Sequence, residues 1–112
     1  MRKTSLDALA REQLAAAHRV DSARSATTVI GGHEHAMRQT LIALTAGAEL
    51  AEHDNPGEAS LYVITGRIEL HADGETWQAR TGDLIEIPPT RHSVDAIEDS
   101  AILLTAVRWK SP

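Results

Sequence analysis

The side chains of this chain that could bind a metal or transfer protons are mainly histidines. His53 lies in the stretch AEHDNPGEASLYVITGRIEL, with Asn55 two positions later, and His33 and His35 have the same spacing in GGHEH. On an extended strand, residues two apart point to the same face, so each pair would present its polar groups together. Imidazole binds transition metals and titrates near neutral pH, which suits metal binding and acid–base catalysis. His92, in PPTRHSV, is a third candidate.

The composition is that of one globular domain. The chain has 112 residues, is 42% apolar and 24% charged, carries a net charge of −5, and contains no cysteine. Disulfides, thiolate nucleophiles and thiolate metal sites are therefore excluded. Nucleic-acid binders need a basic face or aromatic stacking platforms in a cationic groove. There is no basic run, and the aromatic residues are Tyr62, Trp77 and Trp109, so nucleic acid is not expected as a partner.

The N-terminal stretch does not have the pattern of a targeting signal. Asp7, Arg11 and Glu12 interrupt the apolar residues that follow the basic start, whereas a secretory signal needs a continuous apolar region. No apolar run approaches the roughly 20 residues of a membrane span. Together with the lack of cysteine, this pattern predicts a cytoplasmic protein without a membrane partner.

One helix and many short strands are predicted to carry these histidines. Residues 5–18 have apolar side chains at helical spacing, with Thr4 or Ser5 as the cap. The rest of the chain alternates or is rich in β-forming residues, broken by Gly, Pro, Asn and Asp. Strands are predicted near 26–30, 36–45, 49–54, 60–65, 67–72, 75–80, 84–88, 92–97 and 101–109. Many close strands after one helix predict an all-β sandwich or barrel.

Two segments resemble the paired motifs of the cupin superfamily, which are G-x5-H-x-H-x3,4-E-x6-G and G-x5-P-x-G-x2-H-x3-N. In the first motif Gly47, His53 and Gly66 match, whereas Asn55 stands at the second histidine and Ala59 at the glutamate. In the second motif Gly82 and Pro88 match, Thr90 replaces the glycine, His92 comes one residue early, and Ala96 replaces the asparagine. The resemblance covers residues 40–107 and is specific as an indication of fold.

The resemblance implies an all-β fold, a double-stranded β-helix of the jelly-roll type with one N-terminal helix. Residues 1–24 would form the helix and linker, and residues 25–112 the cupin barrel. Small cupins usually form homodimers. An edge strand at 26–30 would suit pairing across a two-fold axis.

The resemblance also implies a metal site at the barrel mouth, holding Fe, Mn, Ni, Cu or Zn through imidazole and carboxylate ligands. This chain keeps His53 and His92, with Asn55, His35 or Glu58 as a possible third ligand. Asn55 is a weaker ligand than imidazole, and strand alternation sends Glu58 to the opposite face unless the preceding turn shifts the register. We therefore expect a reduced or absent metal site and low occupancy.

The predicted ligand pocket contains His53, Asn55, Leu61, Val63, His92 and Gln39. Leu61 and Val63 would give it an apolar floor, although core packing is the ordinary role of such residues. Gln39 could reach a ligand or lie on an exposed sheet face. His33 and His35 could supply missing ligands or form a polar turn after Gly31 and Gly32.

Three functional hypotheses remain open at the level of sequence. The first is a small-molecule-binding cupin domain with a reduced or absent metal site. The second is a metal-dependent dioxygenase, isomerase or lyase that uses His53, His92 and a recruited ligand. The third is a regulatory or partner-binding module. A cupin fold by itself does not distinguish them.

Overall fold

The computed structural model describes residues 1–53 and 57–108, with backbone alone at positions 52, 53 and 108. Its elements, in chain order, are α1 (Leu6–Ala17), β1 (Arg24–Ile30), β2 (Met37–Leu44), β3 (Glu49–His53), β4 (Gly57–Thr65), β5 (Arg67–Ala72), β6 (Glu75–Arg80), β7 (Leu84–Ile87), β8 (His92–Ala96) and β9 (Ser100–Arg108). The predicted helix and the predicted series of strands are confirmed, with bounds that differ by a few residues.

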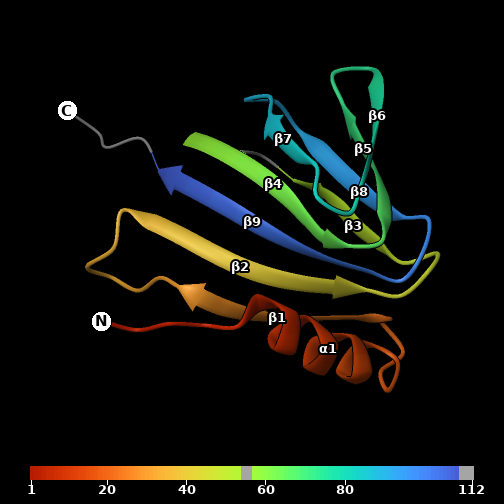
Figure 1. The fold of residues 1–112 in the computed structure, drawn as a ribbon. Coiled ribbons are helices and arrows are strands. Elements are labelled where there is room, and N and C mark those ends of the chain that lie inside the picture. Colours follow the sequence, from red (N-terminus) through yellow and green to blue (C-terminus); the bar gives the residue numbers. More distant parts are fainter. Residues whose placement is uncertain (54–56, 109–112) are drawn as a thin grey trace.

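The strands form two antiparallel sheets that face each other (Figure 1). The larger sheet has the order β1-β2-β9-β4-β7, and the smaller has the order β3-β8-β5-β6. Neighbours such as β2 and β9 are distant in sequence, so crossovers between the sheets build the fold. The mostly β architecture with one N-terminal helix is as predicted.

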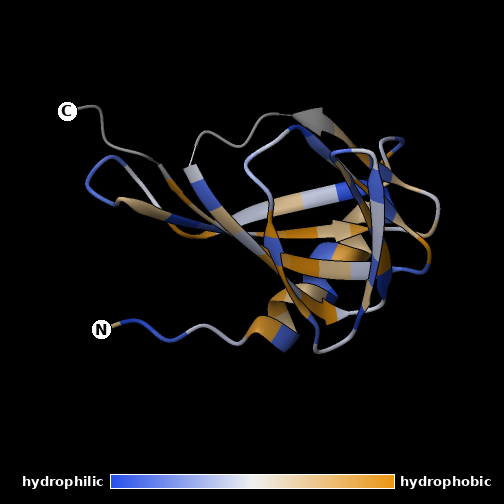
Figure 2. Cartoon of the chain, turned by 90° about the horizontal axis from the view of Figure 1, so that it is seen from above, coloured by the Kyte–Doolittle hydropathy of each residue, from blue (hydrophilic) through white to orange (hydrophobic). Residues whose placement is uncertain are grey.

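The main core lies between the two sheets, on what we call the inner face of each. Alternation places Leu61 and Val63 of β4 there, opposite Ile68 and Leu70 of β5, and all four are at most 1% exposed. Fully burying such a side chain contributes about 1.5–3 kcal/mol. Figure 2 shows hydrophobic residues along the strands and hydrophilic ones in the N-terminal segment and several turns.

Helix α1 covers part of the outer face of the larger sheet. Ser5 Oγ caps it by accepting a hydrogen bond from Ala8 N at 3.3 Å, which satisfies one of the unpaired amides of the first turn. Ala10, with Leu6, Leu9 and Leu14, forms a second cluster with the fully buried Leu41 and Ala101 of the sheet. The helix thus buries its apolar stripe on β2 and β9. Among the described residues, no helix is long and apolar enough to cross a membrane.

The turn between β5 and β6 needs left-handed backbone and carries suitable residues. Asp73 and Gly74 join β5 to β6 with φ of 54° and 76°, as a two-residue hairpin turn with positive φ at both positions requires. The sequence LHADGETW predicts this hairpin, because Asp-Gly is a strong turn signal, and the prediction is confirmed. Its strand β6 lies at the edge of the smaller sheet, and Trp77 on this strand is 49% exposed. Trp77 shares a face with Ala79, a pattern that predicts packing between the sheets. This prediction is wrong, because Ala79 is buried whereas Trp77, nearer the hairpin turn, remains in contact with solvent.

Candidate functional site

His92 lies on the inner face of the smaller sheet, at the beginning of β8. It shares this face with Val94 and Ala96, and the three are 3%, 1% and 2% exposed. Its Nδ1 is 3.2 Å from the carbonyl oxygen of Thr90. A carbonyl can only accept, so Nδ1 carries the proton and, in the neutral ring, Nε2 has the acceptor role. The turn before β8 therefore orients the imidazole and fixes its tautomer.

The backbone of His53 is paired with that of His92. The two Cα positions are direct partners in the antiparallel ladder of β3 and β8, after an irregularity in β3 between Leu50 and His53. On the other side of His92, the register partner is Ala72 of β5. The strand order therefore brings together the two segments that carry the predicted histidine pair. Asn55 lies outside the described residues.

Ala59 contributes only a methyl group to the interior. It is half-buried, packs against the main core, and is paired with Ile87 of β7 and Ala106 of β9. Glu58, the adjacent residue, is exposed on the outer face and paired with Val107. Alternation along β4 holds from Gly57 onward, so Glu58 does not face the core between the sheets.

The remaining predicted site residues lie in different parts of the fold. Leu61 and Val63 belong to the fully buried core. Gln39 shares the outer face of β2 with Leu41, where its Nε2 donates a hydrogen bond to Thr105 Oγ1 at 3.1 Å. His35 is exposed in the turn between β1 and β2. Gln39 and His35 therefore lie apart from the region around His92 on the inner face, which we call the inner-face site.

The described side chains do not form a complete metal site. Among them, no three His, Cys, Asp or Glu side chains come together in an arrangement that could hold a metal. His92 supplies one oriented imidazole, and Ala59, on β4 of the facing sheet, offers only a methyl group. Catalytic transition-metal sites commonly use three protein ligands of nitrogen and oxygen type. The side chains that the structure describes do not fit this requirement.

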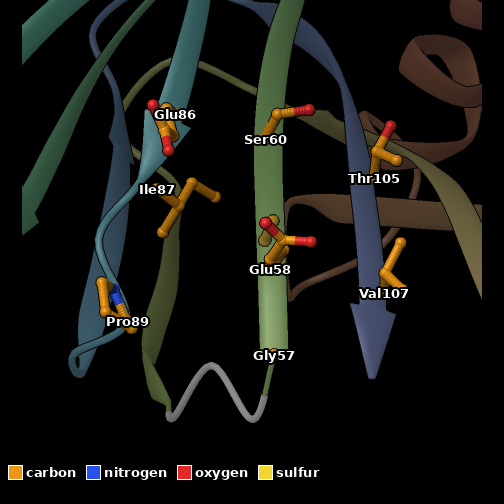
Figure 3. A pocket seen from close by; sticks show the side chains of 9 residues that line it. Gly57, Glu58, Ser60, Glu86, Ile87, Pro89, Thr105 and Val107 are labelled. Atoms are coloured by element: carbon orange, nitrogen blue, oxygen red, sulfur yellow. The ribbon is translucent and has the colours of Figure 1, made fainter. Parts of the chain in front are cut away.

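A groove lies on the opposite, outer face of the larger sheet, across β7, β4 and β9 (Figure 3). Its volume is about 390 Å³. It is lined by the outer-face residues Glu58, Ser60, Glu86, Thr105 and Val107, together with Gly57, Ala59, Ile87 and Pro89. His92 is not among its lining residues. Sequence reasoning missed this groove. Alternation puts Glu58 and Ser60 on one face, but only the strand order shows that Glu86 and Thr105 flank them.

Comparisons with known proteins agree with this geometry. Residues 40–108 match the family model described as "Cupin domain". No curated protein matches the sequence. A conserved protein of unknown function from Streptococcus pyogenes is 25% identical, with 82% of this chain and 80% of that one covered and a TM-score of 0.73. A cupin superfamily protein from Desulfitobacterium hafniense is 12% identical, with 76% of this chain and 79% of that one covered and a TM-score of 0.68.

A domain of a much longer enzyme has a similar fold. A mutant of salicylate 1,2-dioxygenase from Pseudoaminobacter salicylatoxidans is 22% identical, with 90% of this chain and 33% of that one covered and a TM-score of 0.75. At this identity the likeness concerns the fold alone. The family model spans more than half of the chain and the two sheets have the corresponding architecture, so this protein belongs to the cupin domain family.

Proposed function

We propose that this cupin domain binds a small molecule at the inner-face site around His92, and that the site holds a transition metal weakly or not at all. The observation that carries the proposal is Ala59. The position at which the cupin motif has a glutamate carries a methyl group that packs against the apolar core. Without that carboxylate, a divalent cation loses its anionic ligand, whereas an organic molecule gains an apolar wall.

Two polar groups, the imidazole of His92 and the hydroxyl of Thr90, support binding of a small molecule. The ring of His92 is held by its Nδ1–H bond to Thr90, which gives the imidazole a defined orientation and tautomer. The Thr90 hydroxyl oxygen is buried without a hydrogen-bond partner among the described residues. A buried hydroxyl left unpaired costs about 1–3 kcal/mol. A ligand that bonds this oxygen would recover part of that cost.

A metal-dependent dioxygenase, isomerase or lyase is the second candidate, and the orientation of His92 favours it. Metal-binding histidines usually donate their second ring N–H to a carbonyl or carboxylate, as His92 does to Thr90. In this reading His53 and His92 would be ligands and a third ligand would be recruited. A metal bound there would act as a Lewis acid toward the substrate.

Metal content measured on untagged protein tests the proposal. We expect well under one equivalent of Fe, Mn, Ni, Cu or Zn, and little change in melting temperature when these ions are added. A ligand specific for the folded state would raise the melting temperature by mass action, so we expect stabilisation by members of a panel of small phenols and carboxylic acids, lost in His92→Ala. One full equivalent of metal, lost in both His53→Ala and His92→Ala, would instead establish the metal-dependent reading.

A further inference from the structure

The groove on the outer face of the larger sheet has an ordered arrangement of polar side chains. Ser60 of β4 is the direct register partner of both Thr105 on β9 and Glu86 on β7. These three residues therefore form one row across neighbouring strands. Glu58, two positions before Ser60, begins the next row, opposite Val107. Alternation places all five on the outer face, away from the core between the sheets.

The two carboxylates of the groove lie on adjacent strands. Glu58 and Glu86 are diagonal neighbours across β4 and β7, a relation that separates residues by about 7–8 Å. Both are exposed, and neither forms an ion pair within the described part of the chain. A cation midway between them would contact both carboxylates and relieve their mutual repulsion.

The hydroxyl groups between the carboxylates can complete such a site. Thr105 Oγ1 accepts one hydrogen bond from Gln39 Nε2, which fixes the position of the oxygen and leaves a second lone pair. Ser60 has no hydrogen-bond partner in the described part of the chain and can accept from a ligand. These oxygens suit a donor with several N–H groups, such as an ammonium or a guanidinium.

The other walls are apolar, which favours an organic cation over a bare metal ion. Val107 and Pro89 border the groove, and its volume of about 390 Å³ lies within the range of small-molecule pockets. Calcium takes six to eight oxygen ligands, more than two carboxylates and two hydroxyls provide without many waters. Among the described side chains, moreover, no three acidic or histidine residues group as metal ligands.

We propose that this groove is a second binding site, which takes a small organic cation through the carboxylates of Glu58 and Glu86, with the alkyl stem of the ligand against Val107 and Pro89. Ala59 borders this groove as well, but the two carboxylates lie on the outer face of the sheet, and the proposal goes beyond the function proposed for the inner-face site. The larger sheet would thus bind ligands on both faces, one through its core side and one through its outer side.

Amide-resolved NMR titration of the full chain with n-butylguanidinium chloride at low salt tests this site. We expect saturable shifts confined to residues 58–60, 86–87 and 105–107. Glu58→Gln and Glu86→Gln should each raise the dissociation constant about two- to fivefold, as expected for exposed charge pairs. The double variant should show no saturation. Glu98→Gln, which makes the same charge change in an exposed turn, should bind as the original protein does.

Matched ligands and one further variant distinguish the alternatives. n-Butanol and butyrate should produce no saturable shifts in these segments, and His92→Ala should leave guanidinium binding unchanged, whatever happens at the inner-face site. Equal binding of the alcohol, unchanged binding by the double Glu variant, or shifts located elsewhere would each overturn the proposal. Both glutamates are exposed, so the variants are expected to fold, and their melting curves check this.

Discussion

His53 and His92 are direct Cα partners across β3 and β8, although they belong to separate motifs of the sequence. The ladder that pairs them continues from His92 to Ala72 on β5. The position of each histidine is therefore fixed by strand register, and a one-residue slip would turn His92 from the inner face to the outer face. Predictions for the inner-face site follow from this register.

Restoring a carboxylate at Ala59 should convert the site into a better metal site. Ala59→Glu would place a charged group against the apolar core near Ile87, so the metal-free variant should lose about 1–3 kcal/mol of unfolding free energy. Zn²⁺ or Mn²⁺ should restore stability, because metal that binds only the folded state shifts the equilibrium. Thr65→Glu, which adds the same charge at an exposed position at the other end of the same strand, should show no such recovery. Melting curves recorded with and without metal measure this recovery. An equal rise in melting temperature for both variants would contradict the expected geometry.

Asp99 should make stability depend on acid pH. The hydrogen bond from Ala46 N, and then that from His18, lower the pKa of Asp99 below its ordinary value of 3.8. A carboxyl whose pKa is lower in the folded than in the unfolded state stabilises the folded protein at pH values above its unfolded pKa. That stability decreases as the pH falls through 3.8 and toward the lower folded value.

Asp99→Asn isolates this contribution. At pH 7 the variant should be less stable than the original protein, by no more than about 1 kcal/mol because the pair is half-exposed. The difference should shrink below pH 3.8. Chemical denaturation at a series of pH values measures it, and a difference independent of pH would show that charge is not involved.

Gly66 should tolerate no side chain. Its φ is +102°, and a Cβ added there would overlap Ser100 Oγ and the Asp99 carbonyl oxygen and lie 2.7 Å from Ser100 Cα. Gly66→Ala should therefore lose at least about 2 kcal/mol through backbone strain and overlap. Gly74→Ala also has positive φ, but its Cβ would meet nothing within 4 Å, so about 1 kcal/mol of strain is expected. Urea denaturation compares the unfolding free energies of the two variants. Equal losses of unfolding free energy would contradict a role for the close contact between position 66 and Ser100.

His71 should hold three strands together. Its Nδ1 is 2.9 Å from Thr76 Oγ1 on β6, and its Nε2 is 2.8 Å from Asp95 Oδ2 on β8. His71→Ala removes both hydrogen bonds and should cost about 1 kcal/mol, since the group is partly exposed. Hydrogen exchange should accelerate most in β6, the edge strand. Gln78→Ala on β6 is the control. Equal losses of stability in the two variants would argue against a stabilising role for the two hydrogen bonds of His71.

The free edge of β1 determines whether the chain can dimerise as we expect. β1 is an edge strand of the larger sheet, and Arg2 Nη2 donates a hydrogen bond to the carbonyl oxygen of Val29 on it at 2.6 Å. If two chains pair through β1, Arg2→Ala should strengthen the homodimer by freeing this carbonyl for the partner strand. Sedimentation velocity measures the change. Monomers in both proteins would contradict the expected homodimer.

Local patterns in the sequence were sufficient to predict the elements and much of the fold. Alternation along β4 separates Leu61 and Val63 from Glu58 and Ser60, because side chains on a strand point to opposite faces in turn. The hairpin at positions 73 and 74 is predictable because both of its central residues need positive φ. The spacing of glycines and prolines around the two histidine segments indicated a cupin before any strand pairing was known.

Relations between distant strands could not be predicted in this way. The sequence around Gln39 fits the interior or the exterior equally, and only the pairing of β2 with β9 places it beside Thr105. Likewise, the sequence around Trp77 does not show that its strand lies at the edge of a sheet. The groove depends on β7, β4 and β9 being neighbours, which local propensity does not specify. Which residues share a face of each strand is readable from the chain alone, since alternation is a property of the local backbone. Which faces meet is set by the folded protein, because hydrogen bonding between strands brings together residues that are far apart in the chain.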